Sequence, residues 1–83
     1  MADSIAKRVI DVLARSQKRD PATISEDMSF ADLGIDSLDG LRIIFELEEE
    51  FGVEIPEAEM KRYTTVAAAI DGMTRLLDPE TSA

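Results

Sequence analysis

Three segments in which apolar residues recur with the period of an α-helix constrain the fold of this chain most. The second segment has the sharpest ends. Asp36 can cap its start, Asp39 follows three residues later as in a variant of the capping box, and Gly52 comes directly after Phe51. The spacing therefore predicts a helix that opens at Asp36 and runs to about Phe51.

The first and last segments also have readable ends. The first helix is expected to start at Asp3 or Ser4, either of which can cap it, and to run to about Gln17. The last helix follows a threonine cap at position 64 or 65 and ends before an Asp-Pro pair, because a residue before proline disfavours the helical conformation. We expect residues 78–83 to form a frayed tail.

Between the first two helices lies a segment, residues 18–35, with no helix beyond a short turn expected at Ser25–Asp27. A connection of this length in a compact domain is usually functional or held down by its own side chains. Five apolar residues can serve as anchors: Ile24, Met28, Phe30, Leu33 and Ile35. We predict a long ordered loop that lies over the helices.

A short third helix completes the pattern. Pro56 suits the first position of a helix, and we expect this helix over Glu57–Tyr63. No strand pattern is readable, and 83 residues make one domain at most. The sequence therefore predicts an all-α fold, a small bundle of three main helices plus one short helix, in a single domain over residues 1–83.

The residue types that the chain lacks exclude most catalytic and metal chemistry. It has no His and no Cys, so neither a Ser-His-Asp arrangement nor a thiolate metal site can be built. No glycine-rich phosphate loop and no calcium-loop spacing can be found in it. We expect a protein that is not an enzyme and holds no metal.

Net charge and hydropathy narrow the range of partners. A formal net charge of −9 repels nucleic acids and anionic lipids and attracts basic protein surfaces. The first residues contain no apolar run long enough for a signal peptide or a membrane span. We expect a cytoplasmic monomer that binds no nucleic acid and does not insert into membranes.

Most of the negative charge lies in residues 36–60. Nine acidic residues fall there against one basic residue, Arg42, which gives a local charge of −8. Such a run is equally typical of a solvated helix face and of a surface that meets a basic partner.

The second helix has more apolar surface than a bundle helix usually buries. On a helical wheel, Ile43, Ile44 and Leu47 share one face with Phe51, and a second apolar face adjoins it. The second face is made of Leu38, Leu41 and Phe45. Either the long loop covers this second face, or it stays exposed as a docking patch ringed by carboxylates.

Ser37 stands where the long loop meets the second helix. If Asp36 is the cap, Ser37 is the first helical residue and its hydroxyl is free to point outward. A phosphate ester on it would then face the positive end of the helix dipole. The alternative is that Ser37 is itself the cap and has no other role.

Three stretches of the chain resemble acyl carrier proteins. They are Phe30–Asp39, Leu47–Pro56 and Thr64–Asp71, in the same order and at the same spacing as in that family. The resemblance implies that Ser37 receives 4′-phosphopantetheine from coenzyme A and that acyl groups are carried as thioesters on the thiol of this arm. The residues that it implies as support for the modification loop are Gly34, Asp36, Leu38 and Asp39.

The resemblance also implies partners and two further sites. The partners are a phosphopantetheinyl transferase and the acyl synthases, ketosynthases or acyltransferases of fatty-acid, polyketide or related lipid biosynthesis, docking through basic patches. The implied docking residues are Leu38, Leu41, Phe45, Glu48 and Glu49. The implied acyl pocket is formed by Ile43, Leu47, Ile55, Tyr63 and Ala69, which otherwise are ordinary core residues.

Three positions depart from the pattern of that family. Arg42 stands where fatty-acid carriers commonly have an acidic residue, Tyr63 where an aliphatic residue is usual, and Gly40 interrupts the helix. These departures leave fatty-acid, polyketide and other specialised pathways open. Two rival hypotheses are a peptidyl or aminoacyl carrier, which should have a less acidic second helix, and an interaction module that is never modified.

Overall fold

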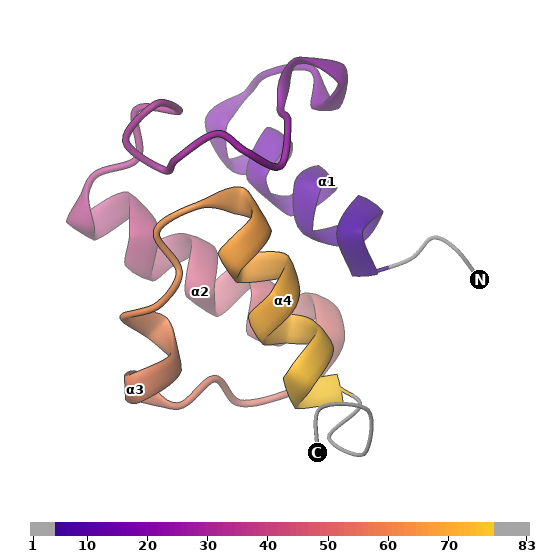
Figure 1. Cartoon of the computed structure of the whole chain (residues 1–83), viewed down its shortest axis with the longest axis vertical. Helices are drawn as coiled ribbons and strands as arrows, with labels where there is room; N and C mark the ends of the chain where they lie inside the picture. Colours follow the sequence, from indigo (N-terminus) through magenta and orange to yellow (C-terminus); the bar gives the residue numbers. More distant parts are fainter. Residues whose placement is uncertain (1–4, 78–83) are drawn as a thin grey trace.

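The computed structural model describes residues 5–77. Its helices are α1 (Ile5–Gln17), α2 (Ser37–Phe51), α3 (Glu57–Met60) and α4 (Val66–Leu77), with a 3₁₀ turn at Pro21–Thr23 (Figure 1). Within these residues there is no strand, only an isolated bridge between Ser29 and Thr65. The all-α fold with three main helices and one short helix is therefore confirmed.

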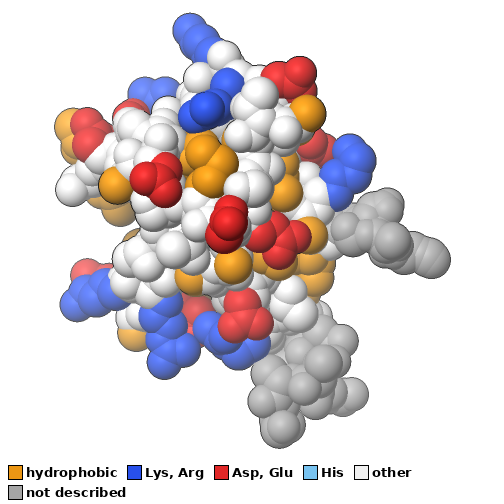
Figure 2. Space-filling view, turned by 45° about the horizontal axis from the view of Figure 1, so that its top comes forward, with side chains coloured by type: hydrophobic (Ala, Val, Ile, Leu, Met, Phe, Trp, Pro, Cys, Tyr) orange, Lys and Arg blue, Asp and Glu red, His pale blue; other side chains and the backbone are white. Residues whose placement is uncertain are grey.

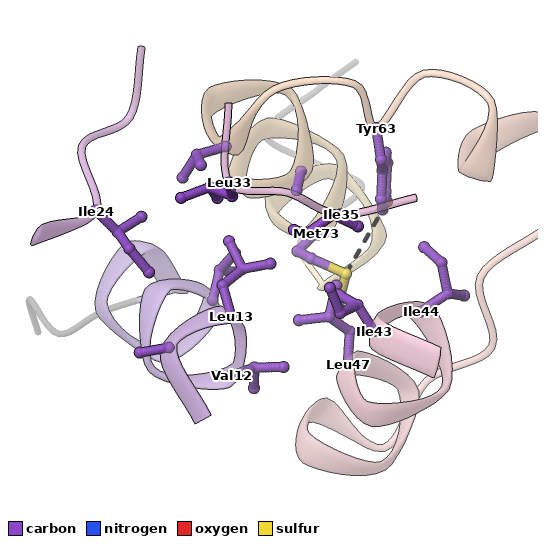
Figure 3. Packing of buried hydrophobic residues seen from close by; sticks show 14 of the residues in the cluster. Val12, Leu13, Ile24, Leu33, Ile35, Ile43, Ile44, Leu47, Tyr63 and Met73 are labelled. Carbon is purple, nitrogen blue, oxygen red and sulfur yellow. Dashed lines mark hydrogen bonds between the residues drawn. The ribbon is translucent and has the colours of Figure 1, made fainter. Parts of the chain in front are cut away.

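The core forms where α1 packs against both α2 and α4. Most of the apolar stripe of α1 is fully buried, and it meets Ile43 and Leu47 of α2 and Met73 of α4, which are also at 0% exposure (Figure 3). Its fully buried members are Val9, Val12 and Leu13. Burial of large apolar side chains of this kind stabilises a domain by roughly 1.5–3 kcal/mol each.

A polar and aromatic contact joins α1 to the far end of α2. Arg8 donates from Nη2 to the backbone oxygen of Glu50 at 2.8 Å and from Nε to its carboxylate at 3.2 Å. The same guanidinium lies 4.4 Å from the centre of the Phe51 ring, a cation–π arrangement. The last turn of α2 is thereby tied to α1.

The loop over residues 18–35 is ordered and lies over one end of the helices, as predicted (Figure 1). Ile24, Leu33 and Ile35 are buried in the core. Three backbone hydrogen bonds attach the loop to the start of α4, with Phe30, Val66 and Ala67 as donors at 2.9–3.0 Å. Side-chain anchors and backbone bonds together hold this long connection in one conformation.

The helical turn in the loop is not where the sequence predicted it. A 3₁₀ turn forms at Pro21–Thr23, where proline needs no backbone donor and the Asp20 carboxylate accepts from Ala22 N at 3.0 Å. The predicted turn at Ser25–Asp27 is instead a single tight turn, closed by Met28 N donating to Ser25 O at 3.2 Å.

The predicted bounds of α2 are confirmed, whereas α3 is shorter than predicted. It ends at Met60, and Pro56 lies just before it in an extended conformation rather than in its first turn. The backbone leaves the helix after Met60, and Tyr63 then turns into the core with 5% of its surface exposed. A helix continued to Tyr63 would be at odds with this inward turn.

The start of α4 settles which threonine caps it. Thr65 Oγ1 accepts from Ala68 N at 3.0 Å, so Thr65 is the cap. Thr64 uses its backbone oxygen to accept from Phe30 N at 2.9 Å in the loop. The predicted start at Asp3 or Ser4 and the predicted tail over residues 78–83 lie outside the described residues.

None of the helices in the described part of the chain has the length and apolar character needed to cross a bilayer.

Candidate functional site

Ser37 is the first residue of α2, and Asp36 is the residue that caps this helix. The Asp36 carboxylate accepts from Asp39 N at 2.9 Å, and the Asp36 backbone is extended. Ser37 is exposed, and no hydrogen bond from its hydroxyl occurs among the described residues. The hypothesis that Ser37 itself caps the helix is therefore wrong, because Asp36 already does so.

A tight turn delivers the chain to Ser37. Gly34 has a φ of 76°, a left-handed conformation that a residue with a side chain adopts at a cost. This turn lets Ile35 N donate to Phe30 O at 3.0 Å while the Ile35 side chain enters the core. The position of Ser37 is set by a buried anchor two residues before it.

The local charge at Ser37 combines two opposing effects. The helix N-terminus favours an anion by roughly 0.3–1 kcal/mol. The carboxylates of Asp36 and Asp39 lie in the same turn and oppose an anion there. The site is therefore suited to a phosphate held by a covalent bond, and less suited to strong binding of a free phosphate.

The second apolar face of α2 is not covered by the loop. Leu38, Leu41 and Phe45 are 77%, 48% and 58% exposed. Figure 2 shows one face of the molecule on which apolar side chains lie exposed among acidic ones. These three residues form a continuous exposed row that begins next to Ser37, and we call them the apolar row.

The three consecutive glutamates near the end of α2 are not equivalent. Glu48 is half-buried, and its Oε2 accepts from Ile55 N at 2.8 Å, which holds the connector after α2. Glu50 pairs with Arg8 at 3.2 Å and reaches Arg15 at 4.0 Å. Glu49 is exposed. The sequence contained no local signal for the role of Glu48, because its partner lies seven residues on.

A partly open pocket of about 170 Å³ lies beside Ser37. Its lining is mostly apolar and comes from the loop, α2 and the α3 region: Phe30, Ser37, Gly40, Leu41, Ile44, Met60 and Tyr63. Of these lining residues, only Tyr63 was predicted from the sequence to belong to a pocket. The signal that it missed was the spacing of Ser37, Gly40, Leu41 and Ile44, which places them on one side of α2.

The other four residues predicted for the acyl pocket lie in the closed core. Ile43, Leu47 and Ala69 are at 0% exposure and Ile55 is at 4%. The structure brings them together with each other and not into the pocket beside Ser37. A role for them in holding an acyl chain remains a prediction.

Tyr63 lines the pocket and also belongs to the buried core. Its hydroxyl lies 3.9 Å from the sulfur of Met73 (Figure 3). Burial raises the pKa of the Tyr63 phenol to about 12, with Glu59 adding to the rise and Arg75 opposing it. The phenol is therefore neutral at physiological pH.

Over the described residues, no group of three or more acidic side chains is placed to hold a metal ion. The geometry thus defines a small helical domain with a free serine hydroxyl at a helix start, next to an apolar pocket and an exposed apolar row.

Comparison with known proteins gives a family whose members carry a group on such a site. Residues 7–72 match the family described as phosphopantetheine attachment site. The chain is 40% identical over 68 residues to acyl carrier protein 2, mitochondrial, of Arabidopsis thaliana. That stretch is 81% of this chain and 54% of the relative, so the chain spans about half the length of this curated protein.

Because the family match covers most of the chain, this protein belongs to the phosphopantetheine-attachment family. The resemblance predicted from the sequence is confirmed. Membership implies a 4′-phosphopantetheine prosthetic group, which was also predicted.

Proposed function

We propose that this protein is an acyl carrier protein, without catalytic activity of its own, that holds acyl groups as thioesters on a 4′-phosphopantetheine arm attached to Ser37. The observation that carries the proposal is the state of the Ser37 hydroxyl. It is exposed, it is not needed as a cap because Asp36 caps α2, and it lies beside an apolar pocket. The thiol at the end of the arm supplies the thioester chemistry that a chain with no Cys lacks.

Attachment at Ser37 is a phosphoryl transfer from coenzyme A. A bond forms between Ser37 Oγ and phosphorus, the phosphoanhydride bond of coenzyme A breaks, and the adenine nucleotide leaves. The hydroxyl proton passes to the phosphopantetheinyl transferase. The chain has no His to accept that proton, which supports a separate enzyme as the catalyst. What the chain supplies is position, because the loop anchors hold Ser37 at the surface.

We propose that partner enzymes dock on α2 through the apolar row and its flanking acids. The row of Leu38, Leu41 and Phe45 provides apolar contact, and Glu48 and Glu49 attract Lys and Arg. Glu49 is the exposed member of this acidic pair, whereas Glu48 also holds Ile55 N. Charged contacts at such a rim mainly raise the association rate, so docking should weaken with salt.

The enzymes served by the carrier are those of fatty-acid, polyketide or related lipid biosynthesis. The Arabidopsis relative is named an acyl carrier protein, which favours an acyl cargo over an aminoacyl one. That relative is also named as mitochondrial. A reducing compartment, the cytoplasm as predicted or the mitochondrial matrix, keeps the terminal thiol of the arm available for acylation.

The proposal is tested by loading the protein with a broad-specificity phosphopantetheinyl transferase and coenzyme A. We expect intact-mass spectrometry to show the addition of one phosphopantetheine group. Ser37→Ala should abolish the addition, and Ser25→Ala, a change at another exposed serine, should not. If the protein stays unmodified while a control carrier is loaded, the alternative of an unmodified interaction module is favoured.

The docking surface has a separate test in the rate of this loading. Glu49→Lys should slow loading severalfold, and added salt should slow the unaltered protein. Glu26→Lys makes the same charge change at an exposed site in the loop and serves as the matched control. Equal rates for the two variants would contradict docking on α2.

A further inference from the structure

The ring of Tyr63 fills a space that exists because position 72 is glycine. A Cβ at Gly72 would lie 2.5 Å from the Tyr63 hydroxyl oxygen and 2.7 Å from Cζ, far inside van der Waals contact. Gly72 is buried within α4, where glycine costs about 1 kcal/mol relative to alanine. This helix therefore carries a glycine where only the absence of a side chain lets the Tyr63 ring lie against it.

The same ring forms part of the wall of the pocket beside Ser37. One part of Tyr63 lines that pocket, and its hydroxyl end reaches Gly72. The hydroxyl also lies near the sulfur of Met73 in the core (Figure 3). Tyr63 thus stands between the pocket and the interior next to α4.

Several contacts hold the Tyr63 segment in place. Arg75 of α4 donates to Glu59 of α3 at 3.1 Å and also pairs with Asp71. Tyr63 N donates to Met60 O at 3.1 Å, and Thr64 O accepts from the loop. An outward swing of the ring would require this segment to move and would leave the buried space at Gly72 unfilled.

We propose that Tyr63 sets an upper limit on the length of the acyl chain that the pocket shelters, so that this carrier is suited to short acyl groups. The inference rests on the proposed function. A pocket of about 170 Å³ has room for roughly six carbons if each methylene takes about the 30 Å³ of a water molecule. A longer chain would meet the Tyr63 ring and leave its remaining carbons in water.

The experiment compares the melting temperatures of the loaded protein with acetyl, butanoyl, hexanoyl, octanoyl and decanoyl groups on the arm. Each methylene that enters the pocket should raise the melting temperature above that of the unacylated form by a few degrees. For the unaltered protein we expect the rise to stop near hexanoyl. Tyr63→Leu removes the ring that closes the pocket and should extend the rise by roughly two carbons.

Two further variants keep the result interpretable. Tyr63→Phe retains the ring without its hydroxyl and should keep the limit of the unaltered protein. Should Tyr63→Leu fail to fold, Tyr63→Met carries the same test, because its flexible side chain can move aside.

The possible outcomes separate this inference from the proposed function. Failure of the unaltered protein to gain phosphopantetheine, seen by mass spectrometry before any melting experiment, rejects the function and the inference together. A loaded protein whose melting temperature rises through decanoyl rejects the inference alone. The inference alone is also rejected if Tyr63→Leu leaves the limiting acyl length unchanged.

Discussion

The two apolar faces of α2 differ in exposure although they are built from the same kinds of residue. On one face, Ile43 and Leu47 are at 0% exposure, in a helix that packs against α1 and in one core cluster with Met73 of α4. On the other, Leu38 and Phe45 are 77% and 58% exposed. Each large apolar side chain left in water forgoes roughly 1.5–3 kcal/mol of burial. One face therefore stabilises the fold, and the other is available to another molecule.

The long loop accounts for this difference. Its anchors Ile24, Leu33 and Ile35 enter the core, and its backbone bonds go to the start of α4. The loop stops short of the apolar row and leaves it open next to Ser37. Substitutions on the buried face should therefore lower stability, and substitutions on the exposed face should weaken partner docking.

The largest effect should come from the buried face. Leu47→Ala should lower the free energy of unfolding by about 2–5 kcal/mol, because it leaves a cavity between helices that cannot close fully. Urea denaturation followed by circular dichroism measures this change. A loss below about 1 kcal/mol would mean that this face is not the core of the domain.

Tyr63 should make the free energy of unfolding fall at alkaline pH. Its pKa is raised to about 12 in the folded protein, mainly by burial, and falls to 10.0 on unfolding. The contribution of the neutral phenol is therefore complete below pH 10 and is lost as the pH rises to about 12, a total of roughly 2–3 kcal/mol.

Tyr63→Phe cannot ionise and serves as the control for this effect. Between about pH 9 and pH 11, urea denaturation should show the unaltered protein losing roughly 1 kcal/mol more stability than the variant. Parallel pH profiles would contradict a buried phenol.

The next largest difference in stability should be between substitutions of Glu48 and Glu49, which lie on either side of the apolar row. Glu48→Ala removes the acceptor of Ile55 N and should lower the free energy of unfolding by about 1–2 kcal/mol, since a buried donor is left unpaired. Glu49→Ala, at an exposed neighbour, should change it by less than about 0.5 kcal/mol. Equal losses in urea denaturation would show that the bond to Ile55 contributes nothing.

The smallest effect on stability should come from the exposed face. Phe45→Ala should change the free energy of unfolding by no more than about 0.5 kcal/mol, because more than half of the side chain is already in water. The same variant should slow phosphopantetheine loading severalfold in the mass-spectrometric assay. A large loss of stability without slower loading would assign Phe45 to the core.

Much of the fold could be predicted because its signals are local. The cap at Asp36, the end of α2 at Gly52 and the stripe of α1 all follow from residues a few positions apart. For Ser37 the local residues left two alternatives, a free hydroxyl or a capping one, and the bond from Asp39 N to Asp36 decided for the free hydroxyl. The end of α3 was missed, because it depends on Tyr63 turning inward against a distant helix.

The sequence by itself determined that this chain is an acidic all-α domain with a serine at the start of its second helix, because helix periodicity, capping and charge are properties of neighbouring residues. Only the tertiary structure decided which apolar face of α2 stays open, that Glu48 holds Ile55, and that Tyr63 lies between the pocket and Gly72. Those outcomes depend on contacts between residues far apart in the chain, and such contacts exist only once the helices and the loop have packed.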